Sequence, residues 1–371
     1  MKRMEPKDEE CCAFMTGEQS FSTDGGLSSL RGARVLVTGA AGFIGSHLVD
    51  ALLNRGAIVR ALDNYSTGSC ENLSHCSDRI EMIEGDIRDL PTCGRACRDA
   101  DLVFHEAALG SVPRSLADPA TTIDVNVGGT ANVFTAAKEA GVRRIVYASS
   151  SSVYGDSSRL PKREGEEGQP LSPYALSKVM NEELAETFSR CFAMELIGLR
   201  YFNVYGPRQS PEGPYAAVIP RFFAAYLSGQ PPVIYGDGRQ SRDFTYVADA
   251  VAANLLAAVA PTSACGASYN VAGGSRTNVL ELADRVREAV GGGPQPRFEP
   301  PRAGDVLHSL ADLARARERF GFEPAWSLSA GLGKSRSHYS AIALLARTST
   351  SEPAAQVNAG GASLPTPPAE T

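Results

Sequence analysis

Tyr174 and Lys178 stand four residues apart in the stretch SPYALSK, which occupies residues 172 to 178. Ser172 is a favoured helix N-cap and Pro173 suits the first helical position, so a helix is predicted to begin here. The i, i+4 spacing places the phenol and the ammonium group on one helix face. A lysine and the positive end of a helix both favour the phenolate form of a tyrosine. The pair could therefore act as a base, although such pairs also occur as plain surface contacts.

Three glycines mark a second candidate site near the start of the chain. In VTGAAGFIGSHL, Gly39, Gly42 and Gly45 form a GxxGxxG pattern between a strand-like run and a helix-like run, with Phe43 and Ile44 inside it. The first glycine permits a tight turn, the second lets backbone approach a pyrophosphate, and the third lets the helix pack on the strand. Backbone N–H groups at the helix N-terminus would bind the phosphates. The pattern predicts a dinucleotide site.

An acidic residue at the end of the next predicted strand indicates which dinucleotide binds. Asp63 follows Gly45 by 18 residues, and a carboxylate there accepts hydrogen bonds from ribose hydroxyls and repels a 2′-phosphate. Asn64, and no arginine, comes next, so NAD is predicted over NADP. In EGDIRD, Asp86 and its neighbour Ile87 are expected to reach the adenine ring. The plain alternative for Asp63 is a turn or helix cap.

The elements that must position these residues alternate along the chain. From about residue 34 to 199, short apolar runs alternate with amphipathic stretches, which predicts right-handed βαβ units and a parallel sheet. The predicted fold class is α/β, a Rossmann-type doubly wound parallel sheet with a smaller interleaved C-terminal substrate domain. The predicted ranges are a disordered extension over 1–30, an NAD-binding domain over 31–203 to which 241–272 returns, a substrate-binding domain over 204–240 and 273–335, and a disordered tail over 348–371.

Composition excludes several classes of function. The 371 residues carry a net charge of −6 with scattered basic residues, which argues against a nucleic-acid partner. No apolar run approaches the roughly 20 residues that cross a bilayer, and no signal peptide is seen, so the predicted location is cytoplasmic, away from membranes. None of the eight cysteines forms a CxxC pair, so no metal site is predicted.

Four motifs in sequence order resemble the extended short-chain dehydrogenase/reductase family. They are the GxxGxxG turn, HEAA at 105–108, NVGGTANV with Asn126, and YxxxK. The resemblance covers about residues 33 to 330 and implies a bound NAD and a nucleotide-sugar substrate. It implies that Tyr174 is the acid/base, that Lys178 lowers its pKa and holds the nicotinamide ribose, and that Ser150 bonds the reacting hydroxyl.

The same resemblance extends to further residues of the cofactor site. Ala107 and Ala108 in the HEAA motif would line that site. Asn126 would support a structural water and the active-site helix, whereas from its residue type alone it could equally cap the start of a helix.

Residues after the predicted fifth strand bear on the reaction. Sugar-nucleotide dehydratases of this family resemble one another in carrying Thr-Asp-Glu before a YG pair, and UDP-glucuronate decarboxylases typically carry Glu there. Here Ser151, Ser152 and Val153 precede Tyr154. Epimerisation by hydride transfer needs no such extra acid or base. The chain is most similar to bacterial UDP-N-acetylglucosamine 4-epimerases of polysaccharide synthesis, which implies a transient 4-keto sugar and tightly bound NAD.

This similarity also implies a set of substrate-binding residues. Arg242, Arg302 and Asp305 match residues that hold the diphosphate and uridine. Ser309 stands where epimerases limited to glucose and galactose tend to have tyrosine, so it would leave room for an N-acetyl group; the plain alternative is a strand-end serine. The implied set is Gly110, Ser111, Arg114, Ser151, Ser152, Asn203, Gln209, Val218, Arg242, Arg302, Asp305 and Ser309.

Several alternatives stay open at this point. The substrate could be UDP-glucose, UDP-glucuronate or an N-acetylated uronate, whose carboxylate Arg114 could hold; the chain could also be a UDP-glucuronate decarboxylase or an NAD-binding scaffold without activity. The helix opening at Ser172 and the segment VNVGGTANVFTAAKEAG are expected to pair in a symmetric homodimer. The segment GKSRSHYSAIALLARTS, after residue 332, is more polar than the closing helix of the family.

Overall fold

A seven-stranded parallel sheet forms the centre of the protein. The structure is a computed structural model that describes residues 24–213, 216–301 and 307–349. The strand order is β11-β6-β5-β4-β1-β2-β3, and every pairing is parallel. The chain reverses its winding direction between β1 and β4, which opens a crevice at the carboxyl ends of these strands. The strands are β1 Arg34–Thr38, β2 Ile58–Asp63, β3 Ile80–Glu84, β4 Leu102–His105, β5 Arg144–Ser150, β6 Glu195–Tyr201 and β11 Ala267–Val271.

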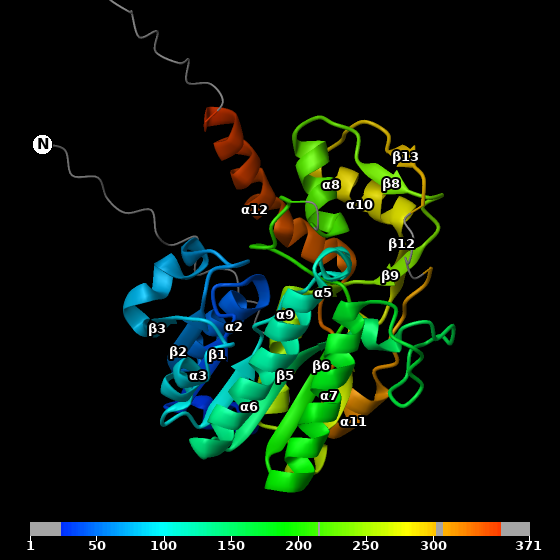
Figure 1. Ribbon diagram of the computed structural model, residues 1–371. Helices are drawn as coiled ribbons and strands as arrows, with labels where there is room; N and C mark the ends of the chain where they lie inside the picture. The colour runs from blue at the N-terminus through cyan, green and yellow to red at the C-terminus, as the bar shows by residue number, and fades with distance from the viewer. Residues whose placement is uncertain (1–23, 214–215, 302–306, 350–371) are drawn as a thin grey trace, which may run out of the picture.

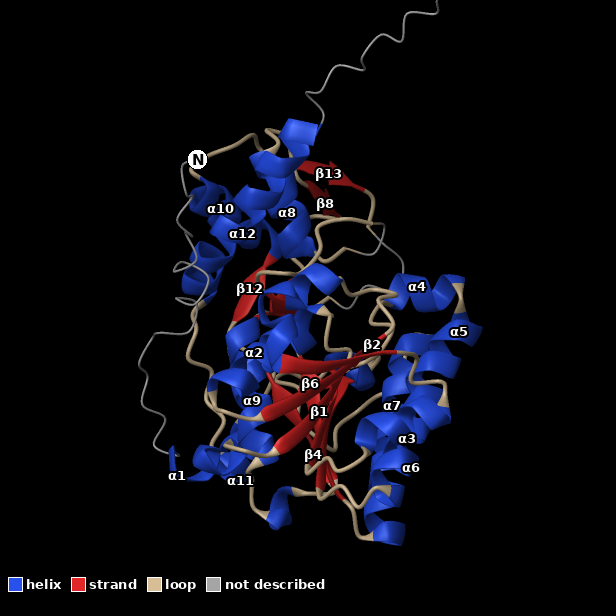
Figure 2. Ribbon diagram, turned by 90° about the vertical axis from the view of Figure 1, so that its left-hand side faces the viewer, coloured by secondary structure: helices blue, strands red, loops and turns tan. Residues whose placement is uncertain are grey.

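Helices cover both faces of this sheet, as Figure 2 shows. One face carries α2 (Phe43–Asn54), α9 (Val247–Ala258) and α11 (Ala314–Phe320). The other carries α3 (Leu90–Cys97), α6 (Gly129–Glu139) and α7 (Pro173–Phe192). Strands with both faces covered read as nearly continuous apolar runs, as β4 does. The predicted doubly wound α/β sheet is confirmed.

A second, smaller lobe lies beyond the carboxyl ends of the strands (Figure 1). Its core packs α8 (Val218–Leu227), α10 (Val279–Val290) and α12 (Leu328–Ser349) together. Short strand pairs complete it: β8 (Val233–Tyr235) with β13 (Arg297–Glu299), β9 (Ser241–Asp243) with β12 (Arg276–Asn278), and β7 (Val204–Tyr205) with β10 (Thr245–Tyr246).

Shorter segments connect the main elements. They are α4 Val112–Ala117, α5 Pro119–Ile123, the π-helical η4 Asp124–Gly128, and the 3₁₀ segments η3 Cys70–Arg79, η5 Ser151–Tyr154 and η6 Thr262–Ala264. None of the helices in the described ranges combines the length and apolar character that crossing a bilayer would take.

The structure corrects three predicted boundaries. Residues 24–30 form α1 (Asp24–Leu27) and η2 (Ser28–Leu30), and Leu27 and Leu30 are buried in the core beside α2 and α9, so the predicted extension ends earlier. The helix α11 packs on β11 and not on the second lobe. The helix α12 continues to residue 349, past the predicted start of the tail. The rest of both predicted disordered segments lies outside the described residues.

Candidate active site

The glycine turn between β1 and α2 brings backbone N–H groups to the crevice. Gly39 has a φ of 66°, a left-handed conformation that suits glycine. A Cβ on Gly45 would lie only 2.1 Å from the Gly39 carbonyl oxygen. The turn is therefore tight enough to need both glycines, and α2 begins at Phe43 with its free N–H groups beside the cavity. This geometry fits a pyrophosphate.

Asp63 stands at the end of β2 and braces this turn. Its carboxylate oxygens accept hydrogen bonds from the N–H groups of Ala41, at 2.9 Å, and Tyr65, at 2.8 Å. Asp63 therefore stabilises a turn, as in the plain alternative considered for it. Each carboxylate oxygen has a second lone pair, and Asp63 lines the cavity, so its contact with a ribose stays a prediction. Asp86 also lines the cavity, where it is paired with Arg88 at 2.8 Å.

A cavity of about 760 Å³ runs along the carboxyl edge of the sheet. Most of the predicted cofactor residues line it, together with both Ser150 and Tyr174. These cofactor residues are Gly39, Gly42, Phe43, Ile44, Asp63, Asn64, Asp86, Ile87, Ala107 and Ala108. Gly45, Asn126 and Lys178 do not line the cavity. All three residues are buried behind its wall. The residues present fit an NAD molecule.

The helix α7 begins where the sequence predicts. The Ser172 hydroxyl oxygen accepts a hydrogen bond from the Ala175 N–H at 3.1 Å, and Pro173 occupies the first turn. Tyr174 therefore projects from the first turn into the cavity beside Ser150. Burial raises the pKa of Tyr174 above its usual value, and the hydrogen bond with Ser150 offsets this in part. Ser150 and Tyr174 thus meet as expected.

Lys178 lies one turn further along α7 and is buried. Its Nζ donates a hydrogen bond to the Ala148 carbonyl oxygen at 2.8 Å. Burial lowers the pKa of Lys178 to about 8, while the carboxylates of Glu106 and Glu182 raise it. The effect of Lys178 on the Tyr174 pKa stays a prediction, and Ser150 is the neighbouring side chain that lowers that pKa.

Asn126 connects the cavity wall to α7. It lies fully buried in the π-helical segment η4, so it does not cap a helix. Its Oδ1 accepts the Leu109 N–H at 2.8 Å, and its Nδ2 donates to the Ser177 hydroxyl at 3.0 Å. Asn126 therefore supports the active-site helix from behind the cavity wall, and its part in the cofactor site stays a prediction.

A second cavity of about 630 Å³ adjoins the first, because Ser151, Ser152 and Asn203 line both. Of the predicted substrate residues, Gly110, Ser111 and Gln209 line the first cavity, while Val218, Arg242 and Ser309 line the second. Arg114 lines neither, because α4 directs Val112 and Pro113 to the cavities instead. Arg302 and Asp305 lie outside the described residues.

Sequence reasoning missed Glu106, although it is part of the quoted HEAA motif. It lines the first cavity, and its Oε1 accepts the Tyr201 hydroxyl at 2.7 Å; Asn254 of α9 donates to the same hydroxyl at 2.6 Å. Burial raises the pKa of Glu106 to about 7, against the lowering effects of Tyr201, Lys178 and Asn254. A carboxylate directly after a buried strand, where side chains face the crevice, was the available signal.

We expect Glu106→Gln to move the alkaline limb of the kcat–pH profile to lower pH. The carboxylate raises the pKa of Lys178, so its removal lowers the pH at which the lysine loses its proton. Below about pH 7 the wild-type carboxyl is itself protonated, so the two profiles should converge there. Turnover measured over a pH range that includes the pKa values of Glu106, about 7, and Lys178, about 8, checks this.

Glu84→Gln is the matched control, since Glu84 ends β3 at the same edge of the sheet but is exposed and far along the strand order from Lys178. Superimposable profiles for Glu106→Gln and wild type would contradict the expectation.

A family model and curated relatives place this site in context. The model of the NAD dependent epimerase/dehydratase family matches residues 35–272. A UDP-glucose 4-epimerase of Mycolicibacterium smegmatis is 41% identical over 305 residues, which cover 81% of this chain and 96% of the relative. A UDP-N-acetyl-alpha-D-glucosaminuronate decarboxylase of Bacillus cytotoxicus is 33% identical over 318 residues, which cover 81% of this chain and 95% of that protein.

A solved structure is similar over nearly its whole length. The UDP-N-acetylglucosamine 4-epimerase of Methanobrevibacter ruminantium, in complex with UDP-N-acetylmuramic acid, aligns with a TM-score of 0.80 and 37% identity. The alignment covers 84% of this chain and 99% of that chain. At this identity and coverage the likeness extends beyond the fold to the sequence.

Proposed function

The chain belongs to the NAD-dependent epimerase/dehydratase family, and on that premise we propose that it interconverts UDP-N-acetylglucosamine and UDP-N-acetylgalactosamine by epimerisation at carbon 4. The observation that carries the proposal is the meeting of Ser150 and Tyr174 in a cavity that fits NAD and opens into a second one. The two adjoining cavities suit a dinucleotide and a nucleotide sugar that react where they meet.

In the proposed reaction, residues of α7 and the last residue of β5 transfer and stabilise the proton. Bound NAD supplies a hydride acceptor and donor next to the sugar. Tyr174 takes the proton of the sugar 4-hydroxyl, holds it while the sugar is a 4-ketone, and returns it at the end. Ser150 hydrogen-bonds Tyr174 and would bond the same sugar oxygen. Lys178 supplies positive charge behind the pair.

The second cavity carries groups that suit a UDP moiety. Arg221 and Arg242 line it, and guanidinium groups bind phosphate oxygens with two parallel hydrogen bonds. Tyr235 lies in the same wall, with the Arg221 guanidinium 5.9 Å from its ring centroid. Arg302 and Asp305, in the segment that follows β13, are proposed to complete this subsite.

The N-acetyl group is the finer part of the proposal. Ser309 is a small side chain in the wall of the second cavity, and its N–H is held by the Ser241 carbonyl at 3.0 Å, which fixes its place. Ser152 has a buried hydroxyl with no hydrogen-bond partner among the described residues. Space at Ser309 and a polar partner at Ser152 together support binding of an N-acetylated sugar.

Two alternatives give different observations. Decarboxylation of UDP-glucuronate would release carbon dioxide, which we expect to be absent, since Ser151, Ser152 and Val153 stand where those enzymes carry Glu. A scaffold without activity would leave bound NAD unchanged with every UDP-sugar, whereas an active site should partly reduce it, which absorbance and fluorescence report.

We expect kcat/KM to be higher for the N-acetylated UDP-sugars than for UDP-glucose, and Ser309→Tyr to reverse that order. A tyrosine there would fill the space proposed for the N-acetyl group, which lowers kcat/KM for N-acetylated substrates roughly ten- to a hundredfold. A side-by-side assay on UDP-N-acetylglucosamine, UDP-glucose and UDP-glucuronate checks both statements.

Leu307→Tyr is the matched control, because it adds the same ring two residues away on an exposed side chain. A wild type that prefers UDP-glucose, or a Ser309→Tyr variant with unaltered selectivity, would contradict the preference for N-acetylated sugars. The proposal of 4-epimerisation would be unaffected.

A symmetric homodimer and a cytoplasmic location stay predictions. Around the start of α7, Leu171, Leu176 and Met180 are exposed apolar side chains, and Leu116 of α4 is exposed beside them in the fold. Such a face suits a closed pairing of two copies. Sedimentation should give a dimer, and a stable monomer at micromolar concentration would contradict this.

A further inference from the structure

Gln209, at the end of the loop Gly206–Gln209, lines the first cavity. The Gln209 amide nitrogen donates to the Val204 carbonyl at 3.1 Å, which directs its Oε1 the other way. That oxygen is buried and has no hydrogen-bond partner among the described residues. A desolvated acceptor left unpaired costs free energy unless a ligand donor reaches it. A sugar hydroxyl in the cavity is such a donor.

Two adjacent residues of α12 hold this loop from one side. The Arg208 backbone N–H donates to His338 Nε2 at 2.9 Å. The Tyr339 hydroxyl lies 3.0 Å from the Gly206 backbone carbonyl oxygen and 3.2 Å from the Gln209 backbone carbonyl oxygen. Its one hydrogen is shared between these two acceptors. Burial lowers the pKa of His338 below its usual value, so near pH 7 the ring is neutral and can accept.

The helix α2 holds the same loop from the other side. His47 Nε2 donates to the Pro207 carbonyl oxygen at 3.0 Å, and the Arg208 guanidinium pairs with Asp50 Oδ2 at 2.8 Å. Arg208 has a φ of 66°, which a residue with a side chain rarely adopts. The loop conformation therefore depends on the contacts made by both helices.

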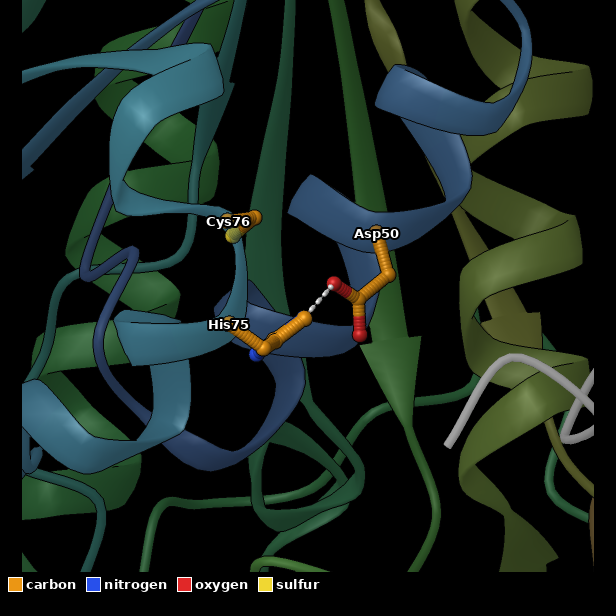
Figure 3. Close-up of side chains that lie close together, drawn as sticks. All are labelled: Asp50, His75 and Cys76. Carbon is orange, nitrogen blue, oxygen red and sulfur yellow. Dashed lines mark hydrogen bonds and ion pairs between the residues drawn. The ribbon is translucent and has the colours of Figure 1, made fainter. Parts of the chain in front are cut away.

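Asp50 also belongs to a group that has the composition of a metal site. Figure 3 shows it with His75 and Cys76, whose potential ligand atoms lie within 4.8 Å of one another. Both Asp50 oxygens are already engaged, one by His75 at 2.7 Å and one by Arg208. The guanidinium opposes a second cation, and burial raises the pKa of the Cys76 thiol, against thiolate formation. The group is better explained as the anchor of Arg208.

We propose that His338 and Tyr339 are positioning residues of the substrate site, which fix the loop Gly206–Gln209 so that the Gln209 side chain stays in the wall of the first cavity and its amide oxygen can accept from the sugar. This inference rests on the proposed function. It gives a role to the polar side of the closing helix: His338 and Tyr339 hydrogen-bond the loop, while apolar residues of α12 pack in the core of the second lobe.

Tyr339→Phe is the cleanest test. The variant keeps the ring stacked on Phe223, with centroids 4.7 Å apart, and removes only the hydroxyl. We expect KM and the calorimetric Kd for the UDP-sugar to rise about three- to tenfold, as for one lost hydrogen bond, with kcat changed far less. His338→Ala should act in the same direction, and His338→Gln, whose amide oxygen can accept the Arg208 N–H, should recover much of the loss.

A double-mutant cycle separates positioning from general stability. If α12 acts through Gln209, then Tyr339→Phe combined with Gln209→Ala should bind no more weakly than Gln209→Ala alone. Ser337→Ala, at an exposed position of the same helix, serves as control and should bind like wild type.

Additive losses, or a lower Tm for Tyr339→Phe with an unchanged Kd, would overturn the inference. A wild type that binds UDP-sugars without epimerising them would contradict the proposed function alone, because binding still reports the loop. A wild type that binds none would overturn both.

Discussion

Replacing Tyr174 with phenylalanine is expected to lower turnover about 100- to 10,000-fold, the range associated with loss of a general acid/base. Tyr174 is the residue of α7 that lines the first cavity, where it lies beside Ser150. The ring itself is kept in the variant, so NAD should remain bound. Turnover of UDP-sugars and the nucleotide released on denaturation measure the two effects separately.

Tyr226→Phe is a matched control for this experiment. Tyr226 lies in α8, lines neither cavity, and has a buried hydroxyl without a hydrogen-bond partner among the described residues. Loss of that hydroxyl should leave turnover unchanged. Near wild-type turnover by Tyr174→Phe with NAD still bound would refute the assignment of the acid/base.

Gly45→Ala is expected to abolish retention of NAD and to lower the Tm. A Cβ at this position would lie 2.1 Å from the Gly39 oxygen and 3.0 Å from the Ala40 Cα. The turn cannot yield easily, because the Gly39 N–H is bonded to the Leu62 carbonyl at 2.8 Å. Either α2 moves away from β1 or the turn opens, and both displace the N–H groups that would hold the pyrophosphate. Overpacking of this kind costs about 1–3 kcal/mol in stability.

The control is Gly94→Ala, in the middle of the short helix α3. No atom lies within 4 Å of a Cβ built there, and alanine is favoured over glycine in a helix by about 1 kcal/mol. This variant should keep NAD and unfold at the same temperature or higher. Thermal unfolding and nucleotide content distinguish the two glycines; a Gly45→Ala protein that retains NAD would contradict the packing argument.

Local patterns in the sequence predicted the sheet and the start of α7 because they depend on near neighbours. The apolar runs of β1, β4, β5 and β6 are determined by burial on both faces, and the Ser172 cap acts three residues away, on Ala175. The buried segment α1–η2 was missed because DGGLSSL has the composition of a loop. Its burial of Leu30 depends on tertiary packing that no local pattern encodes.

Contacts distant in sequence account for the rest of the site. His338 and Arg208 are 130 residues apart, and neither is unusual in its own stretch. Glu106 and Tyr201 are separated by 95 residues, and their pairing becomes apparent only when β4 and β6 end at the same edge of the sheet. Residue types and spacing therefore indicate the groups that react, while the groups that hold them emerge from the fold.

The path of the chain through both lobes determines what can be cut or transplanted. After β6 the chain leaves the sheet to build α8, then returns to supply α9 and the edge strand β11. A fragment ending at residue 203 would lose α9, which covers one face of β5 and β6, and would expose the β6 edge to pairing with other chains. The nucleotide-binding half is therefore not a portable module. Fusion partners should therefore be joined at the ends of this protein, with both lobes kept on one uninterrupted chain.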